Sequence, residues 1–72
     1  MNRKEAVSLF SELVAHGLVT PSFVVIEQRK PDKHQLKIKG DYNFLLISAF
    51  VQSKKLIVEE DKAKECIIVF KP

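Results

Sequence analysis

Apolar residues recur at helical spacing near the start of the chain. Between Asn2 and Gly17 they return every three or four residues, as on one face of an α-helix. Asn2 with Glu5 three residues later has the form of a capping box, and Gly17 followed by Leu18 is typical of a left-handed helix end. The pattern therefore predicts a helix over residues 2–17 whose core side carries Ala6, Leu9, Phe10 and Leu13.

Residues 24–40 contain two strand-like runs around a Pro-Asp pair. The segments FVVIEQ and HQLKIK flank RKPDK, and β-branched residues favour strands as proline favours a turn. We expect a β-hairpin with a loop of four or five residues, because a two-residue Pro-Asp loop is not the twisted turn that hairpins prefer. Leu36 and Ile38 then share one face, and Lys37 and Lys39 lie on the other.

The segment over residues 41–55 is apolar almost throughout its centre. Eight of the ten residues from 42 to 51 are apolar, which fits a helix or a buried strand. Length, leucine and phenylalanine content, and the possible N-caps Asp41 and Asn43 favour a helix. A chain this small cannot surround a helix that is apolar on nearly every side, so we expect part of it to face another subunit or partner.

Two further strand-like runs end the chain, on either side of a polar turn at residues 60–63. The last run, residues 66–70, is apolar on both faces, as a central strand is. The element order is then αββαββ, which predicts a single α+β domain over residues 1–72. We expect the two helices to pack on one face of a four-stranded antiparallel sheet. Which hairpin is central stays open.

Length and cysteine content indicate self-association. A chain of 72 residues is near the size at which one core only just offsets the entropy lost on folding, and the lone Cys66 cannot form an intrachain disulfide. A homodimer would supply the missing burial. The start of the chain lacks the apolar core of a signal peptide, and no apolar run reaches the roughly 18 residues of a membrane span, so we expect a cytoplasmic protein with no membrane partner.

The net charge of +3 can be placed entirely in residues 24–40, where five basic residues meet two acidic ones. These side chains could follow the phosphates of a nucleic acid, with binding that weakens in salt. They could equally keep a hairpin soluble and prevent edge-to-edge pairing, and a single arginine is a weak basis for bidentate recognition. The candidate anion- or nucleic-acid-binding residues are Arg29, Lys30, Lys33, Lys37 and Lys39.

The acidic run of Glu59, Glu60 and Asp61 allows two interpretations. Three adjacent carboxylates would converge on a cation only in a sharply curved loop, and the glycine of such a loop is missing. We expect a solvated turn, or pairing with the basic hairpin of a second copy through individually weak charge contacts.

Few residues point to catalysis or to a cofactor. With only Gly17 and Gly40, no phosphate-cradling loop can be written. His16, His34 and Cys66 have no acid or nucleophile at a catalytic spacing and do not complete a zinc site. We therefore expect no enzymatic activity, no metal, no cofactor and no small-molecule substrate.

Two functions fit these patterns. The first is a small non-enzymatic protein-interaction or regulatory module, a homodimer that binds another protein through apolar helix or sheet surface. The alternative is a nucleic-acid-binding accessory protein that uses the basic hairpin at 24–40. A helix followed by a hairpin over residues 42–70 also fits the wing of a winged helix, although two helices are too few for it. The residues expected on the oligomer or partner surface are Tyr42, Leu45, Phe50, Ile67 and Val69.

Overall fold

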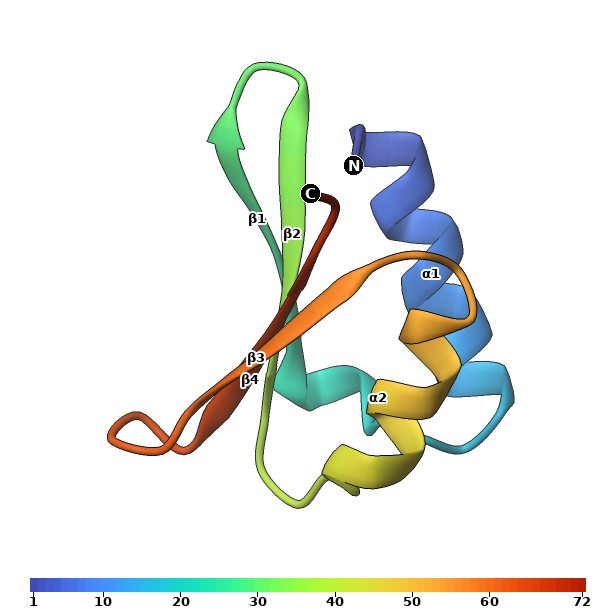
Figure 1. The fold of residues 1–72 in the computed structure, drawn as a ribbon, viewed down its shortest axis with the longest axis vertical. Coiled ribbons are helices and arrows are strands. Elements are labelled where there is room, and N and C mark those ends of the chain that lie inside the picture. The colour runs from blue at the N-terminus through green and yellow to red at the C-terminus, as the bar shows by residue number, and fades with distance from the viewer.

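The chain folds into two helices and one four-stranded antiparallel sheet, which confirms the predicted α+β class (Figure 1). The computed structural model describes residues 1–72. Its elements are α1 (Arg3–Ala15), the short 3₁₀ helix η1 (Pro21–Phe23), β1 (Val24–Lys30), β2 (Lys33–Lys39), α2 (Phe44–Gln52), β3 (Ile57–Asp61) and β4 (Cys66–Phe70).

The strands lie in the order β1-β2-β4-β3, so the second strand of each hairpin is central. β2 and β4 pair antiparallel and join the two hairpins into one sheet, with Leu36 opposite Val69 and Ile38 opposite Ile67. The position of β4 accounts for Ile67 and Val69, which face the core, whereas Ile68 and Phe70 are apolar residues on the opposite face of the sheet. In Figure 1 α1 and α2 are both drawn to the right of the strands.

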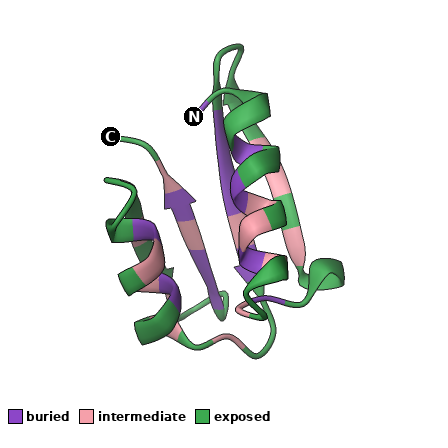
Figure 2. Ribbon diagram, turned by 90° about the vertical axis from the view of Figure 1, so that its right-hand side faces the viewer, coloured by how far each residue is buried: buried purple, intermediate pink, exposed green.

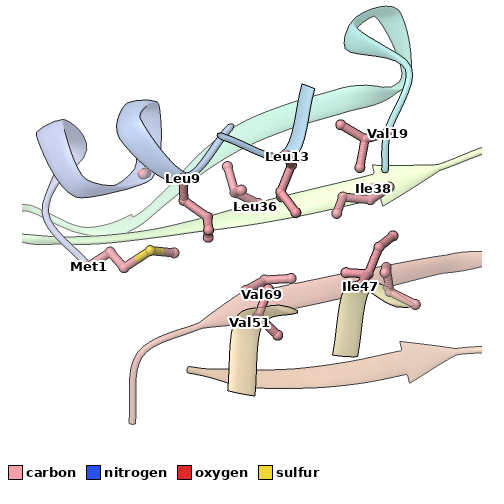
Figure 3. Close-up of a cluster of buried hydrophobic side chains, with 11 residues drawn as sticks. Met1, Leu9, Leu13, Val19, Leu36, Ile38, Ile47, Val51 and Val69 are labelled. Atoms are coloured by element: carbon pink, nitrogen blue, oxygen red, sulfur yellow. The ribbon is translucent and has the colours of Figure 1, made fainter. Parts of the chain in front are cut away.

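The core lies between the helices and the two central strands. Leu9 and Leu13 of α1 lie against Leu36 of β2, and Val51 of α2 lies against Val69 of β4 (Figure 3). Figure 2 shows the same division, with buried segments on the central strands and on the inner sides of the helices. No helix in the structure combines the length and the apolar character needed to cross a membrane.

The start of α1 is held by the predicted capping box. The Glu5 N–H donates to Asn2 Oδ1 at 2.7 Å, and the Asn2 N–H donates to Glu5 Oε1 at 3.0 Å. The Asn2 N–H, helped by Lys71, holds the pKa of Glu5 below its ordinary value of 4.5. A lowered carboxyl pKa means that this stabilisation is complete above pH 4.5 and is lost as the pH falls through the lowered pKa.

The end of α1 also follows the sequence pattern. Gly17 has a φ of 69°, and the Leu18 N–H donates to the Leu13 carbonyl at 3.0 Å, as in a Schellman motif.

α2 uses Asn43, and not Asp41, as its N-cap. The Leu46 N–H donates to Asn43 Oδ1 at 3.1 Å. At the other end the Leu56 N–H donates to the Val51 carbonyl at 3.1 Å, and Lys55 takes the left-handed position that Gly17 takes after α1. The φ of 62° at Lys55 is costly for a residue with a Cβ atom.

Lys55→Gly is therefore expected to raise the free energy of unfolding by up to about 1 kcal/mol, because glycine adopts a positive φ without the clash of a Cβ atom. Chemical denaturation monitored by circular dichroism measures the change. The variant Lys54→Gly changes the neighbouring residue, whose φ is not positive, and also removes the ion pair with Glu12, so it is expected to lower the free energy of unfolding. Equal behaviour of the two variants would contradict the left-handed helix end.

The first hairpin has a shorter loop than expected. Its loop is Pro31–Asp32 alone, with Lys30 opposite Lys33. Neither loop residue has a positive φ, so the turn is not type I′. An extra residue in β1, Arg29, makes a bulge between the pairs of Gln28 and Lys30. Such a bulge adds local twist, which this turn does not supply by itself, so the expectation of a longer loop is corrected.

The acidic run at Glu59–Asp61 lies in β3 and not in the turn, which spans residues 62–65. Alternation along the strand places Glu59 and Asp61 on one face of the sheet and Glu60 on the other.

Candidate functional site

The sheet has one face that the core does not use. Paired residues of neighbouring strands share a face, so the face opposite Leu36 and Val69 can be read from the strand register. We call it the open sheet face. It carries Val25 and Glu27 from β1, Gln35, Lys37 and Lys39 from β2, Cys66, Ile68 and Phe70 from β4, and Ile57, Glu59 and Asp61 from β3.

Apolar side chains are accessible on the open sheet face. Val25 is 51% exposed and Ile57 is 38% exposed, while Ile68 and Phe70 on the central strand are half-buried. Cys66 on the same face is fully buried. A contiguous group of accessible apolar residues, such as Ile57, Ile68 and Phe70 on the neighbouring strands β3 and β4, marks a surface that binds another molecule.

Charge on the open sheet face is arranged in columns. Lys37 and Lys39 stand on β2, and Glu59 and Asp61 stand on β3, with β4 between them. None of these four residues forms an ion pair within the chain. The two ion pairs that the fold contains lie elsewhere, at Lys54 with Glu12 and at Lys71 with Glu5.

A second candidate lies at one end of the sheet, where the tip of the first hairpin, the start of α1 and the end of the chain meet. They surround a hollow of about 740 Å³, which we call the basic hollow. The His34 N–H donates to the Met1 carbonyl at 2.6 Å, which ties the first residue to β2 there. The charged residues that line it are Glu5, Arg29, Lys30, Asp32, Lys33 and Lys71.

Two buried polar atoms at the basic hollow have no hydrogen-bond partner. His34 is 9% exposed with Nδ1 unpaired, and Gln35 is 7% exposed with Oε1 unpaired. The amide nitrogen of Gln35 donates to Glu27 Oε1 at 2.9 Å, which fixes the orientation of the amide. Unpaired buried polar atoms are uncommon in folded proteins, because each costs about 1 to 3 kcal/mol.

The structure divides the five basic residues predicted to bind an anion. Arg29, Lys30 and Lys33 lie around the basic hollow, whereas Lys37 and Lys39 stand on the open sheet face. Alternation along β2 correctly predicted that Lys37 and Lys39 lie on the face opposite Leu36 and Ile38. It did not predict the gathering of the first three with Lys71, which is distant in sequence.

The residues predicted for a partner surface differ in how far they are exposed. Leu45 of α2 is 78% exposed, and Tyr42 and Phe50 are half-buried against the core. Burial and the nearby Glu60, whose carboxylate accepts from the Tyr42 hydroxyl at 3.4 Å, raise the pKa of Tyr42.

Ile67 and Val69 are a correction to the predicted surface. Both are fully buried and belong to the core, because β4 is a central strand and turns these two side chains toward the helices. The accessible apolar residues of β4 are their neighbours Ile68 and Phe70. Period-two alternation could have separated the two sets if the position of β4 in the sheet had been known.

The two histidines and the cysteine do not form one site. The His16 ring lies against Phe50, with 5.0 Å between ring centroids, and Cys66 is buried in β4. No group of three or more histidine, cysteine or acidic residues is placed to hold a metal ion.

No protein family, curated protein or solved structure matches this chain.

Proposed function

We propose that the chain is a small non-enzymatic protein-interaction module that works as a homodimer and associates through the open sheet face. In this proposal the αββαββ chain forms two layers, with both helices on one side of the sheet. The apolar side chains that the neighbouring strands β3 and β4 place on the open sheet face, namely Ile57, Ile68 and Phe70, are the observation that carries the proposal.

Small size supports the same conclusion. A domain of 72 residues buries a smaller share of its surface than a larger one does, so covering a sheet face adds stability that the core alone does not supply. The non-enzymatic part is supported by the buried thiol of Cys66 and by His16, which packs on Phe50. Leu45 and Leu46 of α2 lie on the helical side, so a dimer through the sheet leaves them accessible to another protein.

Sedimentation of the purified protein over a range of concentrations tests the proposal. A face of four short strands is smaller than the roughly 800 Å² per partner of a standard interface, so we expect a dimer that dissociates in about the micromolar range. A single monomeric species up to about 1 mM would overturn the proposal.

The basic hollow supports a second candidate function, binding of a nucleic acid or another polyanion. Three basic side chains of the hairpin meet Lys71 there, beside the unpaired Nδ1 of His34. Phosphate contacts by such residues release counterions, so binding would weaken steeply with salt.

For this candidate we expect the double variant Arg29→Glu with Lys33→Glu to abolish binding of short single-stranded and duplex oligonucleotides, because two cations at the basic hollow become repulsive. Fluorescence anisotropy at several salt concentrations measures it. The control is Lys62→Glu with Lys64→Glu, which makes the same change of charge at the other hairpin and is expected to have little effect. If the parent protein binds no oligonucleotide at low salt, the hairpin cations serve solubility only.

A further inference from the structure

We propose that the partner on the open sheet face is a second copy of this chain, related by a two-fold axis that runs along β4. In this arrangement Lys37 of each copy faces Glu59 of the other, Lys39 faces Asp61, and Ile68 meets Ile68. This inference rests on the proposed function and specifies how the two copies fit.

The strand register supplies the first step. Lys37 lies opposite Ile68 on one side, and Glu59 lies opposite Ile68 on the other, so the three form one row across the sheet. Lys39, Cys66 and Asp61 form the next row in the same way. In both rows a basic residue on β2 and an acidic residue on β3 stand at equal distances from β4, each about 4.8 Å away.

Symmetry supplies the second step. A two-fold axis parallel to β4, midway between two facing sheets, places β4 on β4 and exchanges β2 with β3. Each row then faces the same row of the second copy, with the order of its three residues reversed. Every lysine of the two rows therefore meets a carboxylate. A two-fold interface brings the same patch together from both subunits, so a patch that is complementary to itself under this rotation is what a dimer needs.

The competing two-fold axes fit the charges less well. A two-fold axis can also lie midway between the two sheets and cross the strands at right angles, and β2 then faces β2 of the other copy. If this axis passes over the row of Ile68, Lys37 faces Lys37 and Glu59 faces Glu59. An axis between β2 and β4 sets Lys37 on Ile68 and leaves its charge without a partner. Like charges that face each other across an interface cost several kcal/mol in general, so the axis along β4 is favoured.

The side chains are long enough for these contacts. Packed sheets lie about 10 Å apart, a gap that a lysine and a glutamate bridge together. Lys37 and Glu59 of one chain are separated by two strand spacings, also about 10 Å, and they form no ion pair within the chain. Both charges are therefore free to pair with a second copy.

A charge exchange in one row tests the arrangement. Lys37→Glu places two glutamates opposite each other on both sides of the axis, and Glu59→Lys places two lysines there. Each single variant is expected to dimerise at least about tenfold more weakly than the parent in sedimentation experiments. The double variant Lys37→Glu with Glu59→Lys is expected to dimerise like the parent, because the pairs are restored in reversed order.

Mixing the two single variants gives an independent readout. One chain then carries only acidic residues at positions 37 and 59 and the other only lysines, so the mixture is expected to form a heterodimer while neither variant self-associates. Native mass spectrometry distinguishes the three species when one of the two variants is uniformly isotope-labelled, because lysine and glutamate residues have almost the same mass. This rescue also shows that both variants are folded. Lys4→Glu on α1, with the same change of charge away from the sheet, is the control and is expected to leave the dimer unchanged.

The outcomes separate this inference from the function on which it rests. A monomeric parent protein overturns both. A dimeric parent whose two single variants dimerise normally, or whose double variant and mixture show no rescue, overturns the register and leaves the proposed homodimer standing. Weakening by each single variant together with rescue in the double variant and in the mixture supports the axis along β4.

Discussion

Ile68→Glu is expected to convert the proposed dimer into a monomer. In the proposed dimer Ile68, the apolar centre of the open sheet face, meets its own copy at the two-fold axis, so the substitution sets two carboxylates face to face there. Taking unpaired charges out of water costs several kcal/mol, and we expect the dissociation constant to rise by about 100-fold or more. Sedimentation at a concentration where the parent is dimeric measures the change.

Leu45→Glu is the matched control for Ile68→Glu. Leu45 is the more exposed of the two residues, and it lies in the first turn of α2, where a negative charge interacts favourably with the helix dipole. The control is therefore expected to fold and to dimerise like the parent. The opposite result, a monomer from Leu45→Glu and a dimer from Ile68→Glu, would move the interface from the sheet to α2.

Leu36→Ala is expected to have the largest effect on stability. Leu36 is fully buried on central strand β2, in the cluster that joins α1 to the sheet (Figure 3). Removing a buried leucine side chain costs about 2 to 5 kcal/mol, which combines lost burial with the cavity that remains. A domain of this size has only about 4 to 11 kcal/mol of stability in total, so the loss is a large share of it and the melting temperature is expected to fall markedly.

Thermal denaturation followed by circular dichroism measures the effect of Leu36→Ala at one fixed protein concentration, because the proposed dimerisation would make the melting temperature depend on concentration. Val7→Ala on α1 is the control. Val7 is exposed, and alanine favours helices more than valine does, so little or no loss of stability is expected. A melting temperature for Leu36→Ala equal to that of the parent would contradict the position of Leu36 in the core.

Local features of the fold were predictable because their causes lie within a few residues. The Asn2 and Glu5 capping box closes within one helical turn, and Gly17 ends α1 through its own left-handed φ. For the second helix the sequence offered both Asp41 and Asn43 as N-cap, and in the structure Asn43 accepts the hydrogen bond from the Leu46 N–H. The loop of the first hairpin is shorter than the sequence predicts, because the bulge at Arg29 has no sequence signature comparable to Asn-Gly.

The candidate sites were only partly predictable because they combine strands that are distant in the chain. Lys37 was assigned correctly to the face opposite Leu36, since alternation within one strand is a local property. The neighbours that give Lys37 its role in the proposed dimer, Ile68 and Glu59, come from the other hairpin. The error at Ile67 and Val69 has the same origin, because an apolar run does not tell which of its two faces the helices cover.

The sequence by itself determined the α+β class, the capped first helix, the two hairpins and the facing of side chains within each strand. These features depend on backbone propensity and on periods of two and 3.6 residues, which act over a few neighbours. Only the tertiary structure decided that β2 and β4 are central, and with them the rows that join Lys37 to Glu59 through Ile68. Strand order depends on contacts between distant segments, whose free energy is set by packing of the whole core and not by any local pattern.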